Sequence, residues 1–236
     1  MSAHAKPAPL RGGLVSQERT LPFLLNPRSY PHRPRGVRMV QTHSAFVFIA
    51  SPFVYKVKKS VNFGFLDFST LEKRRLFCER EVALNRRLCP KMYLGVVPIS
   101  RRNGRLTFGP GVKVVEYAVK MRKLSERFFL DKLIERGKVV SGDLDRIVMA
   151  LKMFYEAQHP TPEIESWGQI DRLRISSSEN FTPTVCFIDK TLTQPAFETL
   201  RSYTKAFYAR HAALFRSRVR ERWIRDCHGD LHLEHI

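Results

Sequence analysis

The pattern of apolar residues changes once along this chain, near Ser125, and that change limits the folds the chain can adopt. Before Ser125, short segments rich in β-branched and aromatic residues are separated by turns and interrupted by one amphipathic helix. After Ser125, apolar residues recur with a helical period as far as Arg222. The pattern predicts an α+β fold, in which a β-rich part with one main helix precedes a helical part.

In the first part, strands are expected where β-forming runs are bounded by turn residues, at 37–40, 45–50, 53–58, 93–100, 106–108 and 112–121. A short helix is expected at 17–25. The main helix should run from Leu71 to about Leu88, because Ser69 and Glu72 have the spacing of a capping box. The sequence therefore predicts a sheet with one principal helix.

The second part should contain helices at 127–136, 143–158 and 195–222, followed by a short strand at 223–227. Residues 1–16, which are rich in Ala, Pro, Gly and Arg, are expected to be flexible. We therefore expect a flexible N-terminus at 1–16, a β-rich lobe at 17–124 and a helical lobe at 125–236.

Composition favours a cytoplasmic protein. No apolar run approaches the roughly 20 residues that a membrane span needs, and the N-terminus lacks the apolar core of a secretory signal. The cysteines are scattered without a paired spacing, which favours reduced thiols: Cys78, Cys89, Cys186 and Cys227. No membrane partner is expected.

The chain is strongly basic, with 41 Lys and Arg against 22 Asp and Glu and a formal net charge of +19. Such a charge attracts polyanions, so a basic nucleic-acid-binding module is one hypothesis. The basic residues are dispersed along the whole chain, however, and no RNA-binding aromatic signature or zinc-finger spacing accompanies them. A nucleic-acid partner is therefore not the favoured interpretation.

The motif His228-Gly229-Asp230-Leu231-His232 is the most informative short segment. An Asp in such a loop can accept the proton of a substrate hydroxyl while the hydroxyl oxygen attacks a γ-phosphate. His228 can hold the loop by hydrogen bonding. We interpret Asp230 and His228 as catalytic-loop residues; the alternative is a polar loop with no catalytic role.

Lys56 is the candidate cation for nucleotide phosphates. It lies in the strand expected at 53–58, on the same face as Val54 and Lys58, and a Lys on a rigid strand can hold α- and β-phosphates. Lys58 and Lys59 are close alternatives. The structural alternative is a Lys whose stem snorkels from the strand edge.

A carboxylate on the following helix should orient that lysine. Glu81 and Glu79 are both candidates, and Glu81 is favoured because it borders the apolar stripe of the helix. The alternative is one more exposed charge on a highly charged helix.

Two further segments are candidate nucleotide contacts. The turn Gln41-Thr42-His43-Ser44 lacks the glycines of a kinase phosphate loop, but the hydroxyls of Thr42 and Ser44 could cover phosphates. The strand after Glu116 ends in a connector, where the backbone from Met121 to Lys123 could contact adenine. No G-x-x-x-x-G-K-[ST] motif is present, which excludes a P-loop ATPase within these residues.

The chain resembles the aminoglycoside phosphotransferase-like kinases in the order of its candidate residues: Lys56, Glu81, the connector near Met121 and the motif around Asp230. The chain is most similar to a bacterial subgroup commonly fused to a C-terminal P-loop ATPase domain. The resemblance covers roughly residues 20–236, and its most specific parts are the terminal motif and the block from Phe63 to Leu71.

This resemblance implies a protein-kinase-like bilobal fold and ATP-dependent transfer of phosphate to the hydroxyl of a small molecule, with ATP and Mg²⁺ as cofactors. It implies that Lys56 binds phosphates, that Glu81 orients Lys56, and that Asp230 is the catalytic base. His235 stands where such kinases usually place a magnesium-binding Asn, although imidazole is a poor ligand for magnesium.

The resemblance also implies that the helical lobe is incomplete, because the strand carrying the main magnesium-binding Asp does not follow the catalytic loop within these residues. We therefore expect residues 1–236 alone to show little kinase activity. A pseudokinase or nucleotide-binding regulatory module is the alternative function.

Overall fold

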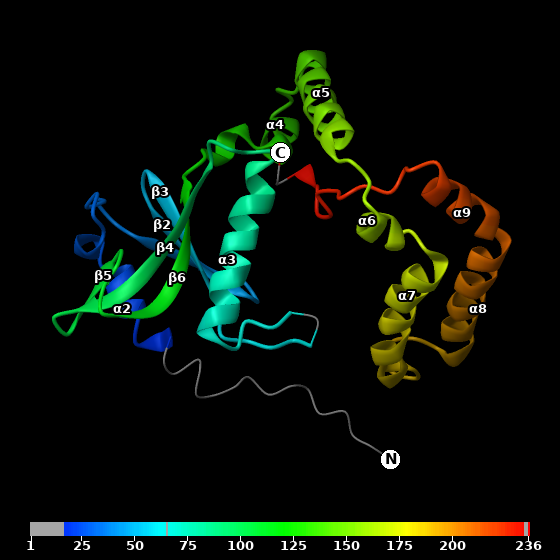
Figure 1. The fold of residues 1–236 in the computed structure, drawn as a ribbon, viewed down its shortest axis with the longest axis horizontal. Helices are drawn as coiled ribbons and strands as arrows, with labels where there is room; N and C mark the ends of the chain where they lie inside the picture. Colours follow the sequence, from blue (N-terminus) through cyan, green and yellow to red (C-terminus); the bar gives the residue numbers. More distant parts are fainter. Residues whose placement is uncertain (1–16, 65, 234–235) are drawn as a thin grey trace. The chain divides into compact units, whose positions relative to one another are not determined.

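The computed structural model describes residues 17–64, 66–233 and 236, and divides the chain into two compact units, Met1–Phe128 and Phe129–Ile236. The flexible segment predicted at 1–16 and the metal ligand predicted at His235 lie outside the described residues. Figure 1 shows a β-sheet with one long helix in the first unit and helices in the second. The α+β class predicted from the sequence is confirmed.

The described part of the first unit contains one six-stranded antiparallel sheet with the order β1-β2-β3-β6-β4-β5. The strands lie close to the predicted bounds: β1 Arg38–Gln41, β2 Ala45–Ala50, β3 Phe53–Lys58, β4 Tyr93–Arg102, β5 Arg105–Phe108 and β6 Lys113–Arg122. Because β3 pairs with both β2 and β6, its side chains lie at the centre of the sheet, where strand geometry is well fixed.

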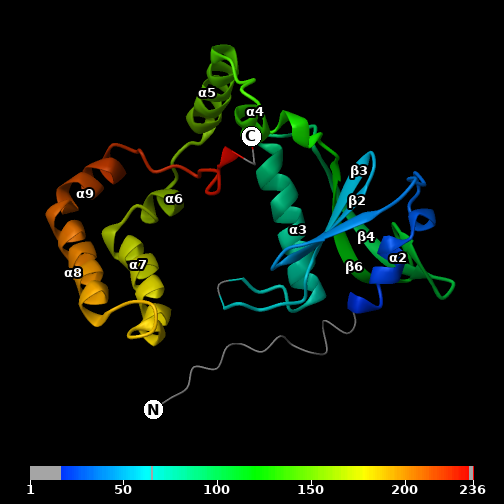
Figure 2. The same ribbon diagram turned by 180° about the vertical axis from the view of Figure 1, so that it is seen from behind.

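The two faces of the sheet bury different clusters. On one face, Tyr55 and Val57 of β3 pack with Leu24 of helix α2 (Leu21–Leu25) and with Tyr30, which follows the 3₁₀ turn η1 (Pro27–Ser29). The other face carries helix α3 (Leu71–Arg86), as Figures 1 and 2 show. Alternation along β3 therefore places its aromatic residues on the α2 face and its lysines on the α3 face; the separation of Lys56 and Lys58 from the aromatic residues is as predicted.

Helix α3 begins at Leu71, as predicted, but its N-cap lies one residue after the predicted Ser69. Its N-cap is Thr70, whose Oγ1 accepts a hydrogen bond from the Lys73 N–H at 3.2 Å. The capping box predicted at Ser69 is wrong because the backbone N–H of Ser69 donates to the Asp67 carboxylate at 2.9 Å, which holds Ser69 in the preceding turn. Hydrogen bonds from Lys73 and Ser69 lower the pKa of Asp67 to about 2. The helix also ends at Arg86, before the expected Leu88.

A fully buried carboxylate, Glu116 of β6, joins α3 to the sheet. The Nε of Arg74 lies 2.9 and 3.0 Å from its two oxygens, and the Tyr117 N–H donates to it at 3.0 Å. Arg74 also donates to the carbonyls of Phe68 and Ser69 at 3.0 and 3.3 Å. Since every one of these partners is fixed, the ion pair sets the position of the first turns of α3.

Gln17 extends this buried network to β3. Its Nε2 donates to Glu116 at 2.6 Å and to the Lys58 carbonyl at 2.8 Å, while its Oε1 accepts from the Ser60 N–H at 2.7 Å. A single amide therefore ties the end of β3 to the carboxylate that holds α3.

The second unit is helical in its described residues: α4 Leu130–Glu135, α5 Ser141–Ala157, α6 Pro162–Ser166, α7 Ile170–Thr184, η3 Val185–Phe187, α8 Gln194–Arg210 and α9 Ala212–Arg220. The predicted helix at 127–136 is divided, because a 3₁₀ turn η2 (Glu126–Phe128) ends the first unit before α4 begins. In the described parts of both units, no helix is both long and apolar enough to cross a membrane.

The single helix expected at 195–222 is wrong, because the chain breaks at His211 between α8 and α9. The break allows the ring of Phe215 to pack against Phe207 and Tyr208, at centroid distances of 6.3 and 5.6 Å. Aromatic packing therefore overrides the continuous helical period of the sequence.

The strand expected at 223–227 is also wrong. Arginine side chains hold this segment instead: Arg222 donates to the Pro160 carbonyl and Arg225 donates to the Gln158 carbonyl, both at 2.7 Å. The approach to the terminal motif is thus a segment without regular secondary structure, tied to the loop after α5.

We predict that Glu116→Ala destabilises the first unit by about 3–5 kcal/mol, because the substitution leaves Arg74 buried without its carboxylate. Hydrogen exchange in peptides from β3 and β6, followed as a function of urea, measures the free energy of unfolding of the first unit. Both tryptophans, Trp167 and Trp223, lie in the second unit, so their fluorescence provides an internal control.

The matched control variant is Glu79→Ala, which removes a half-exposed carboxylate from the same helix and should cost no more than about 1 kcal/mol. Equal effects of the two substitutions would contradict a structural role for the buried pair.

Candidate functional site

The centre of the candidate site is Glu81 of α3, which lies between two lysines of β3. Lys56 Nζ is 3.0 Å from Glu81 Oε1, and Lys58 Nζ is 2.6 Å from Oε2. The lysines share a face because they are two residues apart in a strand, and α3 presents Glu81 to that face. The predicted pairing of Lys56 with Glu81 is therefore present, together with a second cation.

The two lysines differ in exposure: 33% of the Lys56 side chain is exposed, but only 8% of Lys58, and 13% of the Glu81 side chain between them. Burial raises the pKa of Glu81, but the ammonium groups of Lys56 and Lys58 outweigh burial and hold that pKa below its ordinary value. The carboxylate is therefore ionised near neutral pH, and the cluster keeps one net positive charge.

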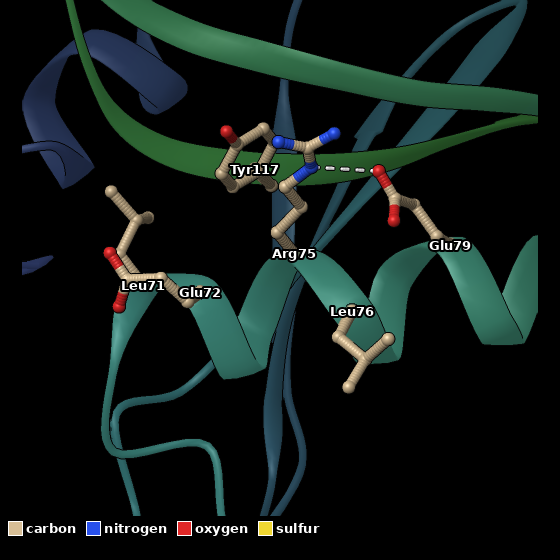
Figure 3. Close-up of a pocket in the computed structure, with 6 residues that line it drawn as sticks. All are labelled: Leu71, Glu72, Arg75, Leu76, Glu79 and Tyr117. Carbon is tan, nitrogen blue, oxygen red and sulfur yellow. Dashed lines mark hydrogen bonds and ion pairs between the residues drawn. The ribbon is translucent and has the colours of Figure 1, made fainter.

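Glu79, the alternative partner, faces elsewhere. Figure 3 shows its ion pair with Arg75, whose Nε lies 2.8 Å from Glu79 Oε1. Both residues line an open groove of about 340 Å³ between α3 and β6, with Leu71, Glu72, Leu76 and Tyr117. The geometry favours Glu81 over Glu79 as the partner of the β3 lysines.

Lys59 has a separate role in the β1–β2 turn. Its Nζ donates to the Thr42 carbonyl at 2.5 Å and lies 4.9 Å from the centre of the Phe46 ring, and its N–H donates to the Ser44 carbonyl at 2.8 Å. Burial lowers the pKa of the Lys59 ammonium. Lys59 therefore fastens the turn to the end of β3 and does not contact Glu81 in the described interactions.

The hydroxyl of Thr42, a candidate phosphate contact, forms hydrogen bonds within the β1–β2 turn. Thr42 Oγ1 accepts from the Ala45 N–H at 3.0 Å and lies 3.2 Å from the Ala45 carbonyl. The Thr42 N–H also donates to that carbonyl at 2.9 Å. Phosphate contact by Thr42 and Ser44 stays a prediction, and for Thr42 it competes with hydrogen bonds that shape the turn.

The connector begins inside the sheet, because β6 continues to Arg122. Met121 is buried in β6 opposite Val54, so its side chain lies on the α3 face of the sheet. The N–H groups of Arg122 and Lys123 donate to the carbonyls of Met92 and Pro52, both at 2.9 Å. Adenine contact at Met121 and Lys123 stays a prediction, and the N–H groups of Arg122 and Lys123 are already engaged in the hydrogen bonds above.

The Asp230 loop lies in the second unit. Gly229 adopts a φ of +80°, which favours glycine, and the Asp230 N–H donates to His228 Nδ1 at 3.3 Å. The loop bond expected of His228 is therefore observed, with Nδ1 as the acceptor. Beyond the loop, the Ile236 carbonyl accepts from the Leu130 N–H of α4 at 2.9 Å.

The described residues contain no group of three or more His, Cys, Asp or Glu that could hold a metal ion. The one metal ligand predicted from the sequence, His235, lies outside them. Nothing in the described part of the chain therefore assigns a magnesium ligand.

Sequence reasoning missed two features of the site. The sequence offers Lys58 only as an alternative to Lys56, whereas Lys58 is the closer partner of Glu81. The buried pair of Arg74 and Glu116 was not foreseen at all. A signal was available, because Arg74, Cys78 and Glu81 recur at i, i+4 and i+7 and thus share the buried face of α3.

Comparison with known proteins finds sequence similarity to proteins that are called uncharacterized. No family model and no solved structure matches it. Three curated proteins, from Mycobacterium bovis and two strains of Mycobacterium tuberculosis, are 29% identical to it over 191 residues, and each is called an uncharacterized protein. The match covers 81% of this chain but only 37% of each relative.

We predict that Glu81→Gln weakens the acid dependence of stability. With its pKa lowered in the fold, Glu81 contributes stability that is fully present above its unfolded value of about 4.5 and is lost as pH falls through the lower folded value. Urea unfolding of the first unit, followed by hydrogen exchange from about pH 7 to about pH 3, measures the effect.

The variant should be less stable than the wild type near neutral pH and should lose less stability on acidification. Glu79→Gln, in the exposed pair with Arg75, is the control and should follow the wild-type acid profile. An unchanged acid profile in Glu81→Gln would show that the lysines do not hold this carboxylate in its ionised form.

Proposed function

We propose that the protein is an ATP-dependent, kinase-like phosphotransferase that transfers the γ-phosphate of ATP to a hydroxyl of a small molecule. The single observation that supports this most strongly is the pairing of Lys56 with Glu81 across β3 and α3. A cation on a central strand, oriented by a carboxylate of the helix that covers it, is the arrangement that kinases use to hold α- and β-phosphates.

The order of elements also supports a kinase-like bilobal fold as part of this proposal. An antiparallel sheet with one long covering helix comes first, and a helical unit that ends in the Asp230 loop follows. In this interpretation the first unit holds the nucleotide phosphates, and the second carries the group that accepts the substrate proton.

In the proposed reaction the substrate hydroxyl oxygen attacks the γ-phosphorus. The bond from that phosphorus to the bridging oxygen breaks, ADP departs, and the hydroxyl proton passes to the Asp230 carboxylate. Lys56 positions the α- and β-phosphates, Glu81 orients Lys56, and His228 holds the backbone N–H of Asp230 through Nδ1. Glu81 serves this purpose only in the ionised form that its two lysines favour.

ATP reacts as its magnesium complex, and magnesium prefers oxygen ligands. Among the described residues no cluster fits that requirement, and an imidazole at His235 would be a poor match. We therefore assign no step to a magnesium ligand of these residues.

The proposal concerns the whole protein, because the chain spans only 37% of the length of the mycobacterial relatives it matches. A C-terminal P-loop ATPase domain, a small-molecule hydroxyl substrate and a cytoplasmic location belong to the same proposal. The greater length of the relatives is compatible with a further domain.

We predict that residues 1–236 bind ATP and that Lys56→Met weakens this binding about tenfold or more, because the cation for the phosphates is lost. Asp230→Asn should leave ATP binding within about twofold, since the loop accepts a proton and does not hold the nucleotide. Calorimetric titration with MgATP measures both. In the full-length protein, Asp230→Asn should abolish phosphorylation of hydroxyl compounds.

Salt dependence distinguishes this function from the basic nucleic-acid-binding alternative. Nucleotide binding at one site should respond to Lys56→Met, whereas binding to a diffuse basic surface should fall steeply with salt and ignore that substitution. Absence of ATP binding by the wild-type chain, with tight salt-sensitive binding to DNA or RNA, would overturn the proposal. Binding of ATP without turnover in the full-length protein would indicate a pseudokinase.

A further inference from the structure

Glu81 has two carboxylate oxygens, and each accepts from a different lysine. A single lysine would be enough to neutralise the carboxylate, so the second cation needs an explanation. The difference between the two lysines in exposure and surroundings supplies one.

Lys58 is held in place from several sides. Only 8% of its side chain is exposed, its Nζ lies 4.8 Å from the centre of the Phe68 ring, and its bond to Glu81 is the shorter of the two. Its carbonyl accepts from Gln17, which also donates to the buried carboxylate of Glu116. Lys58 is therefore fixed at both backbone and ammonium.

Lys56 is less restricted. A third of its side chain is exposed, and its Nζ lies 3.0 Å from Glu81, against 2.6 Å for Lys58. Of the two lysines, Lys56 is therefore the one able to turn towards an anionic ligand in solvent.

We propose that Lys58 is the permanent counter-ion of Glu81, and that this allows Lys56, while Glu81 still orients it, to turn its ammonium group towards a phosphate group. A buried carboxylate with too little cationic charge beside it is strongly unfavourable, so with Lys56 as its only partner each ligand-binding event would weaken the single ion pair of Glu81. With Lys58 in place, Glu81 stays paired while Lys56 binds phosphate. Lys58 is thus a positioning residue, and the identity of the ligand as ATP rests on the proposed function.

The first test needs no ligand. Competitive acetylation of the folded chain, with peptides quantified by mass spectrometry, reports how freely each lysine side chain reacts. Lys58→Met should slow labelling of Lys56 by about threefold or more, because Glu81 then holds Lys56 alone and a neighbouring positive charge is gone. Lys58→Arg, which keeps the charge, should restore the wild-type rate.

The second test uses MgATP. Lys58→Met should weaken binding about tenfold, because phosphate then competes with Glu81 for its only cation. Lys58→Arg, which keeps the second cation, should hold the affinity within about twofold of the wild type. If Lys58 only filled space beside Phe68, the apolar side chain of Met would be tolerated at least as well as that of Arg.

These results separate the inference from the proposed function. Slower Lys56 labelling in Lys58→Met, in a chain that binds no ATP, would support the role of Lys58 and reject the nucleotide. Normal ATP binding, with Lys56 labelling and affinity unchanged by Lys58→Met, would overturn the role of Lys58 and leave the proposed function standing.

Lys56→Met provides a comparison that does not depend on Lys58→Met folding. It should keep a urea midpoint for the first unit close to the wild-type value, because Lys58 still neutralises Glu81. Lys58→Met should lower that midpoint by more than Lys56→Met does, whereas equal destabilisation by the two substitutions would overturn the inference.

Discussion

The buried carboxylate of Glu116 is the interaction on which the first unit depends. It has no exposed surface and is satisfied by Arg74 of α3, by Gln17 and by the backbone of β6. A charge so deeply buried can be tolerated only if all of these partners stay in place, so the ion pair specifies one position for α3 on the sheet. Arg74 and Glu81 are two helical turns apart, and fixing one therefore fixes the other.

The cluster at Glu81 follows from that placement. With α3 held on the sheet, Glu81 in its second half lies against β3, where Lys56 and Lys58 occupy alternate positions. Gln17 connects the two ion-pair clusters directly, because it bonds both Glu116 and the Lys58 carbonyl. The site is therefore built from buried electrostatic pairs that support one another, with hydrophobic packing filling the space around them.

The sequence predicted the features that follow from local periodicity. Alternation placed the strands and assigned Lys56 to the correct face, and the apolar stripe of α3 selected Glu81 over Glu79. The cap at Thr70 and the break at His211 were missed, because hydrophobic periodicity shows neither the side-chain bond that Asp67 accepts from the Ser69 N–H nor the packing of Phe215 on Tyr208. The partnership of Lys58 was missed for a related reason, since it depends on the burial of its side chain.

The lysines at the end of β3 bear on whether the net positive charge of the chain forms a surface that binds polyanions. As whole residues, Lys58 and Lys59 are both buried, and each has a specific acceptor, the Glu81 carboxylate for Lys58 and the Thr42 carbonyl for Lys59. Lysines buried in this way cannot form a general surface for a polyanion, because their ammonium groups are already committed. Among Lys56, Lys58 and Lys59, only Lys56 is partly exposed, and its partner Glu81 is also neutralised by Lys58. The local arrangement thus favours one defined anionic group at this position over diffuse attraction by a net charge of +19.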